Sequence, residues 1–278
     1  MLAIAILAAG KGTRMRSNKP KVLQNLCGIT LVERVLNVCK EIQCDRKFLV
    51  IGHQAELIRE KLIHKYDDLQ YIIQKEQKGT GHAAQQLISS LEGFNGELLV
   101  LNGDVPLIES NTLINLINKH RENKASATII SAKIDNPSGY GRVFADQYDV
   151  VKKIIEEKDC DEEQLENKLT NSGIYCFNSK ELCRVLPRLS SNNKQGELYL
   201  TDVIEMMDKS IHLTVDNSIE VSGINDRIQL AFCERYIQKK LKEYWMKEGV
   251  TFIDSESCTV TSECIFGKDV IVEPQSHL

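Results

Sequence analysis

The residues best suited to chemistry form a glycine-rich, basic segment near the start of the chain. It reads LAAGKGTRMR over residues 7–16, followed by KPK over residues 19–21. Glycines let a backbone approach a ligand closely and expose its N–H groups, which suits phosphate. Arg14 and Lys21 would add the positive charge that a triphosphate requires, the first as a planar fork and the second as a point charge. We therefore predict a phosphate-binding loop here, with a purely structural turn as the alternative.

Two familiar phosphate-binding motifs do not fit this segment. Gly10 and Gly12 begin a G-x-G-x-x-G pattern, but Met15 occupies the position of the third glycine. A Walker A motif, G-x-x-x-x-G-K-[ST], does not occur. The sequence therefore favours neither a dinucleotide fold nor a P-loop.

A second candidate is Asn102-Gly103-Asp104, directly after the apolar run 98–101. Open α/β sheets bind ligands at the carboxyl ends of their parallel strands. A single carboxylate beside phosphates is typical of Mg²⁺, which completes its octahedron with substrate oxygens and water. Asp104 is thus a candidate Mg²⁺ ligand, and a turn residue or a helix cap is the structural alternative.

A third candidate is the segment QKEQKGTGHA over residues 74–83. The amide of Gln74 can donate and accept on one edge, which matches a pyrimidine imide. Gly79 and Thr80 offer backbone groups at a helix start. His82 is more simply explained as a structural hydrogen-bonding residue than as a catalytic one.

Further candidates are weak when taken singly. Glu156 and Asn171 have the side chains that sugar hydroxyls and an acetamido group would require, and Gly141 and Asn225 lie in turn-like segments. No Ser–His–Asp or Cys–His set that could form a covalent intermediate is apparent. We therefore expect a direct displacement.

Alternating strands and helices must position these residues. Strands separated by helical segments indicate right-handed crossovers and a largely parallel sheet. Segments 158–168 and 190–196 are predicted as solvated loops. The predicted strands are 2–7, 48–51, 71–73, 98–101, 127–132, 174–177 and 213–215, and the predicted helices of the first half are 30–41, 56–62 and 81–91.

The pattern changes near residue 226. Asp226 is a candidate cap for a helix that Gly249 would end. Beyond it, apolar triplets recur every six residues, which is typical of a β-helix, with a hairpin or a frayed tail as the alternative. The triplets are 258–260, 264–266 and 270–272. We predict a domain over 1–225, a linker helix over 226–249 and one β-helix coil over 250–278.

Composition excludes several classes of protein. The net charge is −4 over 278 residues, so no basic field points to a nucleic-acid partner. The apolar run 2–9 is far shorter than the roughly 20 residues of a membrane span, and it lacks the features of a secretory signal. The nine cysteines include no C-x-x-C and are predicted to be free thiols. We therefore expect a cytoplasmic protein that binds neither nucleic acid nor membrane.

Taken together, the motifs resemble a known family. This is the bacterial bifunctional N-acetylglucosamine-1-phosphate uridylyltransferase/glucosamine-1-phosphate N-acetyltransferase family. The resemblance extends over residues 1–278 and rests on the order of the motifs. They are LAAGKGTRM, KPKVL, QKGTGHA, NGDVPL, GYGRV, EEKD, NSGIY, GELYLTD and GINDRIQLA.

The resemblance implies a fold and a reaction. The fold would be a three-layer, Rossmann-like α/β nucleotide-diphospho-sugar transferase domain with a mixed, mostly parallel sheet. A linker helix and the start of a left-handed parallel β-helix would follow. The reaction would join UTP and N-acetyl-α-D-glucosamine 1-phosphate into UDP-N-acetylglucosamine and pyrophosphate, for peptidoglycan and lipopolysaccharide precursors. Family members trimerise through a long β-helix that holds the acetyltransferase site, so acetyl transfer is expected to be absent from this chain.

The resemblance also implies roles for particular residues. Asp104 and Asn225 would bind Mg²⁺, and Arg14 and Lys21 would stabilise the triphosphate. Asn102 departs from the family, in which an aromatic residue is common at this position. The nucleotide would be bound by Leu7, Ala8, Ala9, Gly10, Lys21, Gln74, Gly79, Thr80, Asn102 and Gly103, and the sugar by Gly141, Glu156, Asn171 and Asn225.

Two other functions remain open. The glycine-rich loop alone would also suit an enzyme that makes UDP- or dTDP-glucose. The chain could instead be a regulatory module that binds a sugar nucleotide without catalysis. The presence of Arg14, Lys21, Asp104 and Asn225 argues against the second alternative.

Overall fold

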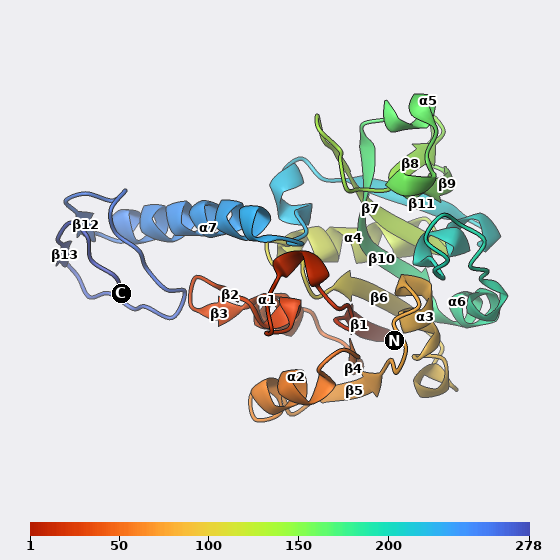
Figure 1. Cartoon of the computed structure of the whole chain (residues 1–278), viewed down its shortest axis with the longest axis horizontal. Helices are drawn as coiled ribbons and strands as arrows, with labels where there is room; N and C mark the ends of the chain where they lie inside the picture. Colours follow the sequence, from red (N-terminus) through yellow and green to blue (C-terminus); the bar gives the residue numbers. More distant parts are fainter.

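A mixed sheet of nine strands organises the computed structural model, which describes residues 1–278 (Figure 1). The strands are β1 (Leu2–Leu7), β4 (Arg46–Ile51), β5 (Leu69–Ile73), β6 (Glu97–Asn102), β7 (Ala127–Lys133), β8 (Arg142–Ala145), β9 (Val151–Ile155), β10 (Leu169–Asn178) and β11 (Ser210–Thr214). Their order is β11-β7-β10-β6-β1-β4-β5, and β8 pairs with both β10 and β9. Strands β5, β4, β1 and β6 are parallel, as are β11 and β7, whereas β10 is antiparallel to both of its main neighbours. The predicted mixed, mostly parallel sheet is confirmed.

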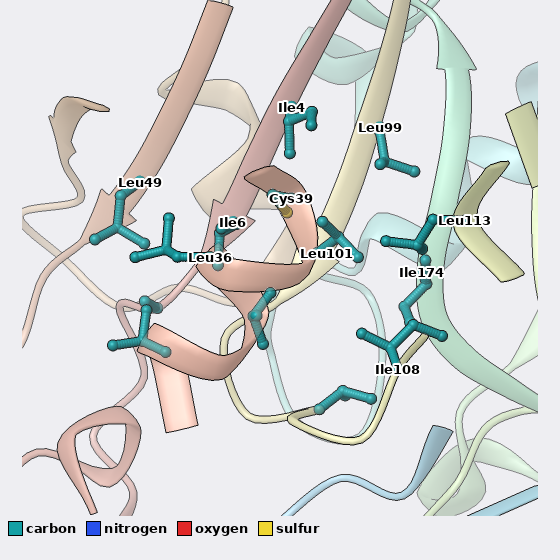
Figure 2. Close-up of a cluster of buried hydrophobic side chains, with 14 of the residues drawn as sticks. Ile4, Ile6, Leu36, Cys39, Leu49, Leu99, Leu101, Ile108, Leu113 and Ile174 are labelled. Atoms are coloured by element: carbon teal, nitrogen blue, oxygen red, sulfur yellow. The ribbon is translucent and has the colours of Figure 1, made fainter. Parts of the chain in front are cut away.

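Helices cover both faces of this sheet and make a three-layer α/β arrangement. They are α1 (Leu31–Lys40), α2 (Ala55–Leu62), α3 (Thr80–Gln85), α4 (Ser110–Glu122), α5 (Glu162–Leu165), α6 (Ser179–Val185) and α7 (Arg227–Lys247). On one face, Leu36 of α1 and Leu113 of α4 pack against strand residues (Figure 2). On the other face, Ala84 of α3 and Leu182 of α6 belong to a second buried cluster.

Strand β1 contributes apolar side chains to both faces of the sheet. Ile4 and Ile6 belong to the first cluster, whereas Ala3 and Ala5 belong to the second. Successive side chains of a strand point to opposite faces, so a strand covered on both sides must be apolar at every position. The apolar run of the sequence therefore marks the centre of the sheet.

Three predictions of secondary structure were wrong in detail. The strand predicted over 213–215 begins earlier, as β11 at Ser210–Thr214. The helix predicted over 81–91 is divided into α3 and a 3-10 turn at Ser89–Leu91. The solvated loop predicted over 158–168 contains α5, which begins with a capping box made by Asp161 and Gln164. This capping box stabilises one helical turn within a segment too polar to show an apolar helical stripe.

Helix α7 extends away from the sheet and leads to the last residues of the chain (Figure 1). Asp226 caps it, as predicted, by accepting a hydrogen bond from the Gln229 N–H. Beyond α7, β12 (Thr251–Phe252) pairs in parallel with β13 (Ile271–Val272), 20 residues later, and Thr259 bridges in parallel to His277, 18 residues later. The β-helix coil expected over 250–278 stays a prediction.

A short hairpin contacts both α7 and the terminal segment, residues 250–278. It consists of β2 (Asn25–Leu26) and β3 (Ile29–Thr30). The backbone N–H of Ser262 donates to the Cys27 carbonyl at 2.9 Å, and the Cys27 N–H donates to Glu234 of α7 at 2.8 Å. Three parts of the chain that are distant in sequence therefore pack at one junction.

The cysteines form no disulfide, as predicted. All nine are free, and most are buried. Burial raises the pKa of Cys39 to about 12, which keeps its thiol protonated at neutral pH. None of the helices combines the length and the apolar character needed to cross a membrane.

The N-terminus of α1 offers a test of the fold. Thr30 and Glu33 form a buried capping box, in which the Thr30 hydroxyl lies 2.6 Å from a Glu33 carboxylate oxygen. Thr30→Ala should lower the free energy of unfolding by about 1–2 kcal/mol, because it removes the acceptor for the Glu33 N–H. Thr30→Ser retains that acceptor and should lose less than half as much in urea unfolding. Equal losses for the two variants would contradict the role of the hydroxyl.

Candidate active site

Two adjoining cavities open at the carboxyl ends of β1 and β6, where the sequence predicted a ligand site. Their volumes are about 500 Å³ and about 300 Å³. The two cavities share Leu7, Thr80, Asn102 and Asp104 in their walls. A ligand in one cavity would therefore contact a ligand in the other near Asp104.

The glycine-rich loop lines the first cavity. Gly12 has a positive φ of 60°, and a Cβ atom there would lie 2.6 Å from the Cβ of Lys21. Glycine is thus required for the loop to turn tightly against the residue that carries the ammonium group. The predicted residues that line this cavity are Leu7, Ala8, Ala9, Gly10, Lys21, Gln74, Gly79, Thr80, Asn102 and Asp104.

Lys21, Asp104 and Asn225 meet where the two cavities join. The Lys21 ammonium forms an ion pair with the Asp104 carboxylate and donates to the Asn225 amide oxygen at 3.1 Å. The Asp104 carboxylate oxygen and the Asn225 amide oxygen therefore both contact the same cation, the Lys21 ammonium. Nowhere in the structure do three or more His, Cys, Asp or Glu side chains gather as a metal site. One carboxylate and one amide oxygen nevertheless fit Mg²⁺, which takes its remaining ligands from phosphates and water.

Backbone contacts fix this triad. The Ile224 N–H donates to the Asp104 carbonyl at 2.9 Å and so ties the segment before α7 to the end of β6. The Asn225 N–H donates to the Gln229 side chain of α7 at 2.7 Å. The start of α7 thereby places Asn225 beside Asp104, 121 positions earlier in the chain by residue number.

Arg14 does not line the first cavity, although the rest of the predicted phosphate-binding loop does. It lines the second cavity, and its side chain is exposed. The 3-10 turn Thr13–Met15 explains this position, because Met15 is buried at 1% exposure and turns its neighbour outward. Lys21 and Arg14 therefore approach the junction from different cavities.

The orientation of Gln74 is set by its neighbours. Its side-chain NH₂ donates to the Gly79 carbonyl at 3.2 Å and lies 3.0 Å from Nδ1 of His82. The contact with Gly79 uses one hydrogen of the NH₂ group, and the amide oxygen is left as an acceptor for a ligand. That Gln74 binds a base stays a prediction. His82 serves as a hydrogen-bonding partner, as predicted.

The second cavity contains the residues predicted to bind a sugar. Gly141, Glu156, Asn171 and Asn225 all line it. Thr201 donates to Glu156 at 3.2 Å, and burial raises the pKa of the Glu156 carboxyl, reinforced by neighbouring acids.

Asn171 is itself held in place within this wall. Its side-chain NH₂ donates to the Tyr175 hydroxyl at 2.7 Å, and its oxygen accepts from the Gly173 N–H at 3.1 Å. One amide hydrogen is left, so Asn171 can still donate to a ligand.

One predicted residue lies behind the site. Gly103 lines neither cavity, and its N–H donates to the Leu7 carbonyl at 2.9 Å. This hydrogen bond joins the end of β6 to Leu7, where the glycine-rich loop begins. Asn102 packs closely on Gly173, where any side chain would collide with its amide.

Several lining residues were not singled out from the sequence. Gln77 and Glu197 line the first cavity, and Tyr140, Tyr175 and Thr201 line the second. All five belong to motifs that carried the resemblance, but none of the five was assigned a role; the motifs are QKGTGHA, GYGRV, NSGIY and GELYLTD. Their side chains have no distinctive spacing that would identify them without a structure.

Asp202, next to Thr201, provides a test of the electrostatics of this wall. Burial, with Glu205 and Asp159 nearby, raises the pKa of Asp202 from 3.8 to about 6. The ionised Asp202 carboxylate therefore lowers the free energy of unfolding above pH 6. Below pH 4 the carboxyl is protonated in both the folded and the unfolded state, so this effect is absent. Asp202→Asn should stabilise the protein by about 1 kcal/mol at pH 7.5, after allowance for partial exposure, and by less at pH 4.5.

Urea unfolding at the two pH values measures this difference. Asp208→Asn is the control, because its side chain is largely exposed. A gain for Asp202→Asn that does not change with pH would contradict the raised pKa.

The chain matches other proteins along its whole length. It is 55% identical over 278 residues to the bifunctional protein GlmU of Prochlorococcus marinus strain MIT 9313. It is 56% identical over 277 residues to the protein of the same name from Synechococcus sp. strain CC9902. The chain spans 62% of the first relative and 61% of the second.

Solved structures show the same fold at low sequence identity. A UDP-glucose pyrophosphorylase complexed with UDP-glucose aligns with a TM-score of 0.69 and 15% identity, over 86% of this chain and 98% of that one. A putative glucose-1-phosphate thymidylyltransferase from Bacillus anthracis aligns with a TM-score of 0.67 and 16% identity, over 85% of this chain and 95% of that one. Residues 3–247 match the nucleotidyl transferase family. Because this match covers most of the chain and includes both cavities, the chain belongs to the nucleotidyl transferase family.

Proposed function

We propose that this chain transfers a uridylyl group from UTP to N-acetyl-α-D-glucosamine 1-phosphate and releases pyrophosphate. The observation that carries the proposal is the convergence of Lys21, Asp104 and Asn225 where the two cavities join. The motifs of the sequence and the GlmU relatives support this choice of substrates.

The nucleotide would occupy the larger cavity and the sugar phosphate the smaller one. The larger cavity has the glycine-rich loop for phosphates and the Gln74 oxygen for a base. The smaller cavity has the carboxylate of Glu156 and the amide of Asn171 for hydroxyl and acetamido groups. The reacting phosphates would then meet beside Asp104.

The chemistry is an in-line displacement at phosphorus. An oxygen of the sugar phosphate attacks the α-phosphorus of UTP, a P–O bond forms, and the bond to the β,γ-pyrophosphate breaks. Lys21 would neutralise phosphate charge from the first cavity, and Arg14 would add positive charge from the second. As in other phosphoryl transfers, most of the catalysis comes from positioning and charge neutralisation.

Asp104 and Asn225 would hold Mg²⁺ for this reaction. When bound, the ion would neutralise phosphate charge and hold the phosphates in line. Lys21, whose ammonium now contacts both oxygens, would then be free to contact phosphate.

Three further proposals rest on the resemblance. The chain would divide into a uridylyltransferase domain (1–225), a linker helix (226–249) and the first coil of a β-helix (250–278). The protein would be cytoplasmic and would assemble into trimers, as the bifunctional enzymes do. UDP-N-acetylglucosamine would serve the synthesis of cell-wall precursors.

A comparison of acceptors tests the proposed reaction. Purified protein, UTP and Mg²⁺ are incubated with N-acetylglucosamine 1-phosphate or glucose 1-phosphate, and pyrophosphate release is followed. We expect release to be much faster with the acetamido sugar. Equal or faster release with glucose 1-phosphate would favour the UDP-glucose alternative, and binding of the sugar nucleotide without release would favour a regulatory module.

Asp104→Asn tests the proposed metal ligand. It should lower kcat at least about a hundredfold, because the neutral amide binds Mg²⁺ and balances phosphate charge poorly. Asp135→Asn is the matched control, since that side chain is fully exposed. Circular dichroism checks the fold of both variants. Near-normal turnover of folded Asp104→Asn would remove this carboxylate from the site.

Gln74 generates a prediction about the base. Its oxygen can accept from the N3–H of uracil, whereas cytosine has a bare acceptor at N3. UTP should therefore be preferred over CTP by about ten- to a hundredfold in kcat/KM, as a mispaired buried polar contact costs roughly 1–3 kcal/mol. Gln74→Ala should reduce this ratio toward one, and Gln70→Ala, on the exposed side of β5, should preserve it. An unchanged ratio in Gln74→Ala would show that the base is read elsewhere.

A further inference from the structure

Arg142 is a buried cation that lines neither cavity. Its exposed fraction is 2%, and it is the first residue of β8. Removing a guanidinium from water is costly unless it is paired and hydrogen-bonded. The contacts that offset this cost show what the side chain holds together.

Those contacts are with a neighbouring loop and a neighbouring turn. Nη1 donates to the Pro137 carbonyl at 2.9 Å and also to the Tyr140 carbonyl. Nη2 lies 3.9 Å from a carboxylate oxygen of Glu157. The side chain thus turns back onto the loop 137–141 and reaches the turn that follows β9.

Both partners of Arg142 are adjacent to the second cavity. Gly139, Tyr140 and Gly141 line it from the loop, and Glu156 lines it immediately before Glu157. The guanidinium therefore connects two walls of the cavity from behind without entering it.

Two backbone hydrogen bonds also hold the loop, because the Tyr140 N–H donates to the Pro137 carbonyl at 3.2 Å and the Asn171 N–H donates to the Gly141 carbonyl at 2.9 Å. The middle of the loop has little further support. Ser138 and Gly139 are exposed, Gly139 has a positive φ of 87°, and a Cβ at Gly139 would touch nothing within 4 Å. Tyr140 extends the same wall, because its hydroxyl faces Ser222 and Gly223, just before Asn225. Without the guanidinium, the loop would lose the contacts that select one of its conformations.

We propose that Arg142 is a positioning residue that fixes the loop 137–141 as the wall against which the sugar moiety binds. The inference rests on the proposed placement of the sugar phosphate in the second cavity. Arginine suits this task because its planar fork can hold two carbonyls and approach a carboxylate at once, which a lysine ammonium cannot do in the same geometry.

The test separates the two substrates. KM for UTP and for the sugar 1-phosphate that the wild-type protein uses are measured for Arg142→Lys and Arg142→Gln. We expect KM for the sugar phosphate to rise at least about tenfold, with KM for UTP changing less than twofold. Arg184→Gln is the control, because Arg184 is exposed on α6 and pairs with exposed Asp208.

A second variant tests the loop directly and leaves the buried arginine in place. Pro137→Gly loosens the loop at one of the two carbonyls that Arg142 holds, so it should also raise KM for the sugar phosphate selectively. In the Arg142→Lys background it should add little, because the restraint is already lost. If the Arg142 variants do not fold, Pro137→Gly alone carries the test.

The outcomes are distinct. Unchanged KM values in folded variants, or equal rises in both, would overturn the inference while the proposed function stands. A wild-type protein that uses another sugar 1-phosphate in place of the N-acetylated one would overturn the proposed function, and the variants would still test Arg142. A wild-type protein that uses no sugar phosphate would overturn both.

Discussion

The contact of the Lys21 ammonium with Asp104 and Asn225 is the interaction around which the site is organised. It joins the basic loop, the end of β6 and the segment before α7 at one point. A carboxylate at the mouth of two cavities needs a counter-charge, and the lysine supplies it in this structure. The Lys21 ammonium could equally neutralise a phosphate group. The same lysine would therefore balance Asp104 in the free site and phosphate charge in the proposed complex.

The two halves of the sheet contribute differently to this arrangement. The parallel strands β1 and β6 end side by side and carry the glycine-rich loop and Asp104 to the same edge. Part of the second cavity comes instead from the antiparallel strand β10, whose register with β7 shifts between Asn171 and Tyr175. Gly173 within this irregularity has a positive φ of 75° and leaves room for Asn102. Asn171 and Tyr175, on either side of this irregularity, both line the second cavity.

Helix α7 connects this edge to the rest of the chain. Asn225 and the cap residue Asp226 lie at the start of α7, while Gln238 on the same helix donates to the Val260 carbonyl of the terminal segment at 2.8 Å. The hairpin that contacts α7 and the terminal segment begins at Asn25, shortly after Lys21. The packing of the terminal segment and the placement of Lys21 and Asn225 therefore depend on one junction.

The sequence by itself determined the doubly buried strand β1, the mostly parallel sheet and the glycine-rich loop, because each depends on local periodicity or on backbone freedom at a glycine such as Gly12. It also indicated Asp104, since strand ends bind ligands. Only the tertiary structure decided that Arg14 lines the second cavity, that the Gln74 amide nitrogen contacts Gly79 and His82, and that Arg142 is buried beside the wall of the second cavity. These outcomes depend on which partners occupy each donor and acceptor, and those partners come from segments that only folding brings together.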